Sequence, residues 1–251
     1  MYRKYVPFLL FLFFLYGCNG NKQEEKEDVS VFVDLPQLKA EGEITAVTLY
    51  SSTSYFQYKM QPMGYEYDLI NDFAKSQGLK LNIKVAENPA RLIEMLEAGE
   101  VDVVAYPIPI NNKLKQEVIY CGREDISSQV LIQRANKGDK LLTDVTQLID
   151  KNVYVKPNTK YSERLKNLDE ELGGGIHIQK VENDSIATED LIEMVSLGEI
   201  PYTISDDNTA RLNKTYYWNI NVDLKVSFPQ RSSWVVRKSS PDLAKAIDEW
   251  A

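Results

Sequence analysis

The sequence predicts an α/β fold made of two similar lobes. From Glu43 onward, strand-like segments alternate with segments that carry the periodicity of amphipathic helices, an order typical of βαβ units and a mostly parallel sheet. An internal repeat indicates two lobes, because LIEMLEAGEV at 92–101 and LIEMVSLGEI at 191–200 are identical at six of ten positions. Each copy has the pattern of a helix, a glycine stop and a strand. Duplication of such a unit is a simpler account than chance similarity.

The first lobe is predicted over residues 44–127. In the predicted helix over 65–76, Leu69, Ile70 and Phe73 share one face, and Gly78 follows where a C-terminal cap is expected. The elements expected in this lobe are strands at Ile44–Tyr50, Leu79–Ala86 and Val101–Tyr106, and helices at Tyr65–Ser76 and Pro89–Ala98.

The second lobe is predicted over residues 128–231, and residues 232–251 return to the first lobe. Two similar apolar strands, Ser128–Arg134 and Ser232–Arg237, bracket the second lobe and are predicted to be paired hinge strands. The final helix, Pro241–Trp250, ends without a cap or a polar tail, so we expect a longer parent protein. The other expected elements are helices at Thr143–Ile149 and Tyr161–Leu172, strands at Asn152–Lys156 and Ile176–Val181, and a strand (PYTISD) after the second repeat.

The N-terminus has the pattern of an export signal. Two basic residues precede the apolar run VPFLLFLFFLY, which is too short to span a bilayer and ends at Gly17 and Cys18. The sequence LYGC resembles the lipobox of bacterial lipoproteins. We therefore predict a signal peptide over 1–17, lipidation of Cys18 and a flexible polar tether over 18–43. A plain secretory signal and an uncleaved anchor are the alternatives.

Composition argues against several classes of function. The net charge is −8 without a cluster of basic residues and interleaved aromatics, so no nucleic-acid partner is expected. His177 is the single histidine and has no neighbours at metal-ligand spacing, and Cys121 follows apolar residues typical of a buried site. No hydrolase, nucleotide-binding or zinc-protease motif is present. We predict no catalytic residue, no metal and no cofactor for this chain.

Polar and aromatic residues follow four predicted strands. The carboxyl ends of strands in an open α/β sheet are where ligands bind, near the amide donors of helix N-termini. Turn formation and helix capping are the alternative role for each segment taken alone. The candidate ligand-binding residues at these ends are Tyr50, Ser52, Thr53, Tyr55, Tyr106, Pro107, Asn158, Thr159, Asp206 and Asn208.

Two stretches, GYEYDLINDFAKSQGLKLNIKV and LIEMLEAGEVDVVAYPIPINN, resemble the extracellular solute-binding proteins of family 3. TLYSSTSYF, YTISDDNTARLNKTYYWNINVDL and FPQRSSWVVRKSSPDLAKAIDEW resemble, more narrowly, the N-terminal domain of the membrane-bound lytic murein transglycosylase F family. The resemblance implies a two-lobed, periplasmic-binding-protein-like (type II) domain. It also implies that Asp206 holds a ligand ammonium. Where the family has an arginine that grips the ligand carboxylate, the nearest basic residue of this chain is Lys113. Lysine lacks the bidentate fork of arginine, so a peptide or muropeptide fits as well as an amino acid.

Two classes of function follow from the resemblance. The first is a sensor domain that regulates a C-terminal lyase domain, lipid-anchored in the cell envelope and expected at the outer membrane facing the periplasm. The second is a free-standing solute-binding lipoprotein of an amino-acid transporter. An enzyme acting alone is a distant third. In both leading classes the partners are a small-molecule ligand and, through the lipid anchor, a membrane.

Overall fold

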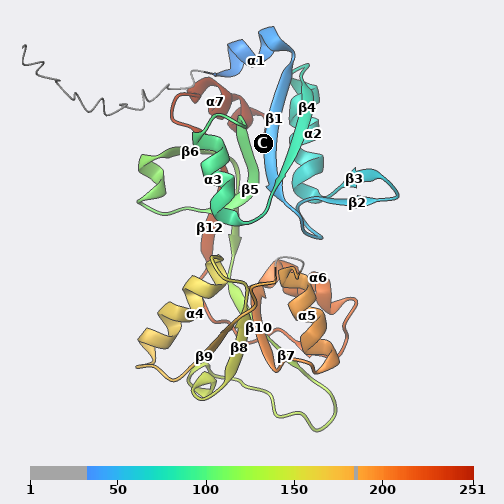
Figure 1. The fold of residues 1–251 in the computed structure, drawn as a ribbon, viewed down its shortest axis with the longest axis vertical. Coiled ribbons are helices and arrows are strands. Elements are labelled where there is room, and N and C mark those ends of the chain that lie inside the picture. Colours follow the sequence, from blue (N-terminus) through green and yellow to red (C-terminus); the bar gives the residue numbers. More distant parts are fainter. Residues whose placement is uncertain (1–32, 184–185) are drawn as a thin grey trace, which may run out of the picture. The chain divides into compact units, whose positions relative to one another are not determined.

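A computed structural model describes residues 33–183 and 186–251 of the chain, and its first sheet forms one lobe (Figure 1). This sheet has the order β4-β1-β5-β12-β6. Its strands are β1 (Glu43–Leu49), β4 (Lys80–Ala86), β5 (Val103–Pro109), β6 (Val118–Ser127) and β12 (Gln230–Arg237). The lobe also contains α1 (Leu35–Glu41), α2 (Tyr65–Ser76), α3 (Pro89–Glu97), α7 (Pro241–Trp250), the 3-10 turn η1 (Leu114–Gln116) and a hairpin of β2 (Phe56–Tyr58) and β3 (Gln61–Met63).

A second sheet, with the order β11-β7-β10-β8-β9, forms the other lobe. Its strands are β7 (Gln129–Arg134), β8 (Asn152–Val155), β9 (His177–Lys180), β10 (Tyr202–Asp206) and β11 (Ile220–Asn221). Its helices are α4 (Lys160–Glu171), α5 (Thr188–Leu197) and α6 (Asp207–Lys214), with the 3-10 turn η2 (Val145–Leu148). No helix in the described ranges is long and apolar enough to cross a membrane.

Apolar side chains pack on both faces of each sheet. In the first lobe, Phe73 and Leu243 belong to one core cluster, and Leu92 packs with Val47 and Val104 in another. The second lobe repeats this arrangement, with α4 contributing to one cluster and α5 to the other. Sheets covered by helices on both faces are typical of α/β proteins, and the predicted α/β class is confirmed.

The two copies of the repeat form equivalent units. Leu92 in α3 and Leu191 in α5 hold the first position of the repeat, and both are buried against their sheets. Gly99 and Gly198 follow the helices with left-handed φ angles of 71° and 80°. These left-handed angles strain any residue with a Cβ atom, and at Gly198 the Arg134 guanidinium would also have to move to admit one. The predicted duplication of a helix, a glycine stop and a strand is therefore present in the fold.

The prediction of a mostly parallel sheet is wrong, because both sheets are mixed. β1 pairs in parallel with β4 and β5, and β8 pairs in parallel with β9 and β10. β12 runs antiparallel to β5 and β6, and β7 runs antiparallel to β10 and β11. β7 and β12 each follow a place where the chain passes from one sheet to the other, and each runs against the other strands of its sheet.

The two predicted hinge strands adjoin the places where the chain passes between the lobes. Ser128–Arg134 directly follows β6 and forms β7 inside the second sheet, and Ser232–Arg237 lies within β12 of the first sheet. At this crossing β6 and β12 pair with each other, and Ser127 lies opposite Gln230. Both predicted segments are apolar because they are interior strands buried on both faces.

Residues 34–41 belong to the flexible tether predicted over 18–43, but they are folded; residues 18–32 and the predicted signal peptide lie outside the described residues. The Asp34 carboxylate caps α1 and also accepts hydrogen bonds from the Asp242 and Leu243 amides of α7, at 3.0 and 2.8 Å. Leu38 of α1 is buried in the core of the first lobe. Figure 1 shows α1 beside α7, so this helix is held by the far end of the sequence, which local patterning does not reveal.

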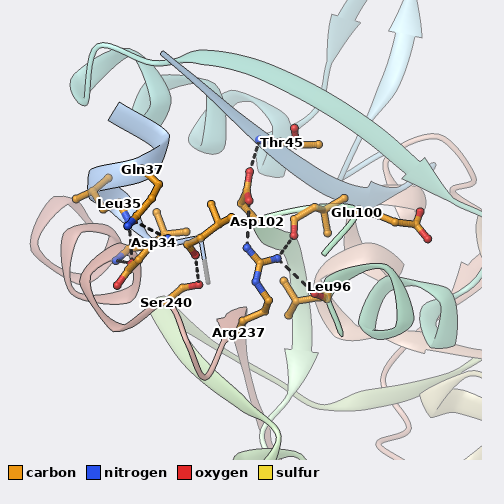
Figure 2. Close-up of polar contacts among 12 residues, drawn as sticks. Asp34, Leu35, Gln37, Thr45, Leu96, Glu100, Asp102, Arg237 and Ser240 are labelled. Atoms are coloured by element: carbon orange, nitrogen blue, oxygen red, sulfur yellow. Dashed lines mark hydrogen bonds and ion pairs between the residues drawn. The ribbon is translucent and has the colours of Figure 1, made fainter. Parts of the chain in front are cut away.

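A buried arginine lies close to this helix junction (Figure 2). Arg237 pairs with Asp102 at 3.1 Å and donates to the Leu96 and Val101 carbonyls, while Asp102 also accepts from the Thr45 amide. An unpaired charge here would be costly because the arginine is buried. The network therefore joins β12, β1 and the turn after α3, and its role is structural.

Candidate functional site

A cavity of about 1560 Å³ is lined by both lobes. Residues from the first turns of α2 to α6 line it, together with the ends of β1, β5 and β10. Strand ends and helix N-termini present free amide donors, which suits the binding of a small polar ligand.

Nine of the predicted site residues line this cavity. They are Tyr50, Ser52, Thr53, Tyr106, Pro107, Asn158, Thr159, Asp206 and Asn208.

Tyr55 and Lys113 do not line the cavity. The Tyr55 side chain is buried, and its ring packs edge-on against Tyr67 with the ring centroids 5.6 Å apart. Lys113 is exposed at the start of η1. The role of Lys113 in holding a ligand carboxylate stays a prediction, and the lining of the cavity does not support it.

Asp206 lies in the cavity and already has a cationic partner. Its Oδ2 lies 2.5 Å from the Lys160 Nζ and accepts a hydrogen bond from the Tyr161 hydroxyl at 3.2 Å. Asp206 is also the N-cap residue of α6, but its side chain makes no capping bond. Its carboxylate thus faces the first turn of α4, and the ion pair satisfies one of its oxygens.

Hydrogen bonds at two places join the lobes at the cavity. The Ser52 hydroxyl donates to Glu189 Oε1 of α5 at 3.2 Å. Asn208 of α6 donates to Asp125 Oδ2 of β6 at 3.3 Å and accepts from the Ser127 hydroxyl at the same distance. Both pairs are exposed and contain neutral partners, so each adds little to stability. They are contacts that opening and closing of the lobes can break and remake.

Asn158 and Thr159 serve the local turn before α4. Asn158 has a left-handed φ of 56°, which asparagine tolerates better than most residues. The Thr159 hydroxyl caps α4 by accepting from the Ser162 amide at 3.3 Å, and it donates to the Lys156 carbonyl at 2.8 Å. The alternative given above, capping, therefore accounts for the Thr159 side chain. The loop still lines the cavity.

Glu66 is the most strongly perturbed acid of the cavity. The Trp234 indole donates to its Oε2 at 2.6 Å. Burial raises the pKa of Glu66 to about 7, Asp125 adds to the rise, and the indole hydrogen bond opposes it. Glu66 therefore changes charge near neutral pH.

Tyr106 lies among several carboxylates. Burial raises its pKa most, and the negative charges of Asp206, Glu189 and Glu66 follow in that order. Burial likewise raises the pKa of Glu189, against the hydrogen bond from Ser52. The middle of the cavity is thus partly dry and negatively charged.

Sequence reasoning missed four residues that shape this site: Glu66, Lys160, Glu189 and Trp234. Glu66 and Glu189 are the second residues of α2 and α5, where acidic side chains commonly stabilise a helix N-terminus. Lys160 begins α4, and Trp234 lies within a buried strand. Glu66, Lys160 and Glu189 could have been found by their positions in the first turn of a helix. Trp234 could have been found only by its place in a strand of the same sheet.

The described residues include no group of three His, Cys, Asp or Glu side chains placed to hold a metal ion. Cys121 is buried in the core, where burial raises the pKa of its thiol, and His177 is exposed on β9.

Comparison with known proteins agrees with this geometry. The model of the bacterial extracellular solute-binding proteins, family 3, matches residues 44–251. Membrane-bound lytic murein transglycosylase F of Desulfosudis oleivorans is 31% identical over 85% of this chain and 46% of that protein. The protein of the same name from Stutzerimonas stutzeri is 28% identical over 86% of this chain and 44% of its own length. The chain thus spans less than half the length of these relatives.

Solved structures give the same fold. The arginine-bound form of truncated ArgBP from T. maritima superposes with a TM-score of 0.72 at 20% identity, covering 85% of this chain and 97% of that one. The substrate-binding protein of an amino acid ABC transporter gives a TM-score of 0.66 at 21% identity, covering 83% and 91%. The matched family and fold are those of a binding domain and not of a catalytic one. From residue 44 to its end, the chain belongs to the bacterial extracellular solute-binding proteins of family 3.

Proposed function

We propose that this chain is the ligand-sensing domain of a lytic murein transglycosylase in the cell envelope. In this proposal a small polar ligand, such as a muropeptide, a peptide or an amino acid, binds in the cavity that both lobes line. The observation that carries the proposal is that cavity, with helix N-termini from both lobes around it. The likeness to transglycosylase F over 85% of the chain supports the choice of parent enzyme.

The size of the cavity favours a ligand larger than a free amino acid. Its volume of about 1560 Å³ exceeds the roughly 300–1,000 Å³ of common small-molecule pockets. Lys113, the residue nearest to an amino-acid carboxylate grip, lies outside it, and Arg123 is the one arginine in its lining. A peptide or muropeptide spreads its polar groups over a longer surface, which suits the scattered hydroxyls and carboxylates of this site.

The second candidate is a free-standing solute-binding lipoprotein of an amino-acid transporter. The fold it shares with a substrate-binding protein of an amino acid ABC transporter favours this reading. The complete gene separates the two candidates. A lyase sequence downstream supports the sensor, and a neighbouring permease gene supports the transporter component.

Native mass spectrometry of the purified protein tests whether it carries a ligand. We expect a mass shift that disappears on unfolding, and calorimetry should then give heat with muropeptides or short peptides. Heat only with free amino acids would favour the transporter reading. If neither muropeptides, peptides nor amino acids bind, the proposed function is wrong.

A lipid anchor at Cys18 completes the proposal, with the protein expected at the outer membrane facing the periplasm. Cys18 lies outside the described residues, so the support for the anchor is the LYGC pattern after the apolar run. Asp206 is proposed as a ligand-binding residue whose position in the cavity supports that role.

A further inference from the structure

Three carboxylates and the phenol of Tyr106 line the same cavity. Glu66 comes from α2 in one lobe, while Glu189 of α5 and Asp206 of β10 come from the other. All three charges act on Tyr106 and raise its pKa. The Tyr106 hydroxyl has no hydrogen-bond partner within residues 33–183 and 186–251 and faces a cavity large enough for a ligand.

Of these three acids, only Asp206 has a cationic partner in the described part of the chain. Lys160 pairs with it at 2.5 Å. Glu66 accepts from the Trp234 indole and Glu189 from the Ser52 hydroxyl, which are neutral donors. The whole lining is also acidic, since seven carboxylates stand against three basic side chains. The acids are Glu66, Glu87, Asp125, Glu163, Glu189, Asp190 and Asp206, and the bases are Arg123, Lys156 and Lys160.

Glu66 and Glu189 have no cationic partner among the described residues, so holding either carboxylate in its charged form costs free energy. A half-buried carboxylate loses hydration, and like charges nearby add repulsion. Both glutamates lie in the first turn of a helix, where the helix dipole stabilises an anion. That help is incomplete, because burial still raises the pKa of both groups. A ligand with a positive charge would remove the remaining cost, whereas a negative one would add to it.

We propose that Glu66 and Glu189 form a subsite for a cationic group of the ligand, an amine or a guanidinium. This inference rests on the proposed function and assigns a chemical class to its ligand. The Trp234 indole orients Glu66 through Oε2, which leaves the other oxygen of that carboxylate for a ligand N–H donor. Tyr106, which lines the same cavity, offers an acceptor oxygen. Asp206 is not needed to bind the positive charge of the ligand, because Lys160 already neutralises the Asp206 carboxylate.

Calorimetry with matched pairs of probes tests the subsite. The pairs are L-arginine against L-citrulline, and alanyl-lysyl-alanine against its Nε-acetylated form, so each pair differs chiefly in one positive charge. We expect the cationic member of at least one pair to bind about tenfold tighter or more, as charge-assisted hydrogen bonds in a partly dry site do. Glu66→Gln and Glu189→Gln should each remove most of that preference. Glu97→Gln, on an exposed position of α3, is the control and should keep it.

Several outcomes would overturn the inference. These are equal affinity within both pairs, tighter binding of the neutral members, or a preference that survives in the Glu66→Gln, Glu189→Gln double variant. The comparison of probes on the unaltered protein needs no variant to fold. Binding of muropeptides without any preference for positive charge would overturn the subsite and leave the proposed function standing. Absence of binding by muropeptides, peptides and amino acids would overturn both.

Discussion

Replacing Glu66 by glutamine should stabilise the protein at neutral and alkaline pH. The side chain is half-buried, and burial is the largest cause of its raised pKa, with the charge of Asp125 adding to it. Glutamine has nearly the same shape, carries no charge and keeps an oxygen that can accept from the Trp234 indole. The substitution therefore removes the cost of the charge and retains the hydrogen bond.

The size and sign of the effect follow from the pKa. The pKa rises from 4.5 to about 7 in the folded protein, and each pKa unit corresponds to about 1.4 kcal/mol. Between these two values the folded state binds more protons than the unfolded state, so the free energy of unfolding falls as pH rises. The full cost, about 3 kcal/mol, is present above the folded pKa and absent below the unfolded one. Glu66→Gln should therefore gain up to about 3 kcal/mol near pH 8 and almost nothing near pH 4.

Urea unfolding followed by circular dichroism, at steps from about pH 4 to pH 8, measures this difference. Glu97→Gln is the matched control, since that glutamate is exposed on α3, and it should follow the parent within about 0.5 kcal/mol at every pH. A Glu66→Gln variant that is no more stable than the parent near pH 8 would refute the reasoning. A constant difference across the pH range would mean that packing, and not charge, causes it.

Three further predictions concern the anchor, the chemistry and the ion pair of the cavity. Cys18→Ser should shift the protein from the membrane to the soluble fraction, and equal membrane binding of variant and parent would contradict lipidation. The chain incubated with purified murein should release no 1,6-anhydromuropeptides above a control without protein, and their detection by mass spectrometry would show lyase activity. Lys160→Met should free Asp206 and tighten the binding of L-arginine about tenfold by calorimetry, whereas Asp206→Ala should leave Lys160 unpaired and weaken it. Unchanged affinity in both variants would show that this ion pair takes no part in ligand binding.

Much of the fold was predictable because periodicity and stop signals are local. The helix at Tyr65–Ser76 has the predicted bounds, and the repeat at 92–101 and 191–200 marks equivalent units of both lobes. Helix α1 could not be predicted in this way. It is seven residues long, and Asp34 joins it to the α7 amides, more than 200 positions away in sequence. The pairing of β12 with β6 is equally non-local, and local patterning does not reveal it.

The position of the cavity could be predicted from the sequence, but the charges and side-chain directions in its lining could not. Strand ends gave nine residues that line the cavity, because topology alone brings those ends together. Side-chain direction is not encoded in this way, so Tyr55 packs on Tyr67, and Lys113 lies outside the lining of the cavity. Glu66 and Glu189 carry an ordinary helix N-terminal signal, and only the fold shows that both face the cavity.

The ion pair of Lys160 and Asp206 changes what the family resemblance implies. An aspartate that holds a ligand ammonium in amino-acid binders here holds an ammonium of the chain itself. A ligand amine at Asp206 must displace Lys160 and leave that lysine without its partner, which offsets the bond it gains. The same amine beside Glu66 and Glu189 displaces no cation and neutralises charge that burial makes costly. The energetic preference of a cationic ligand therefore moves from Asp206 toward the glutamates, and the volume of the cavity leaves room for that shift.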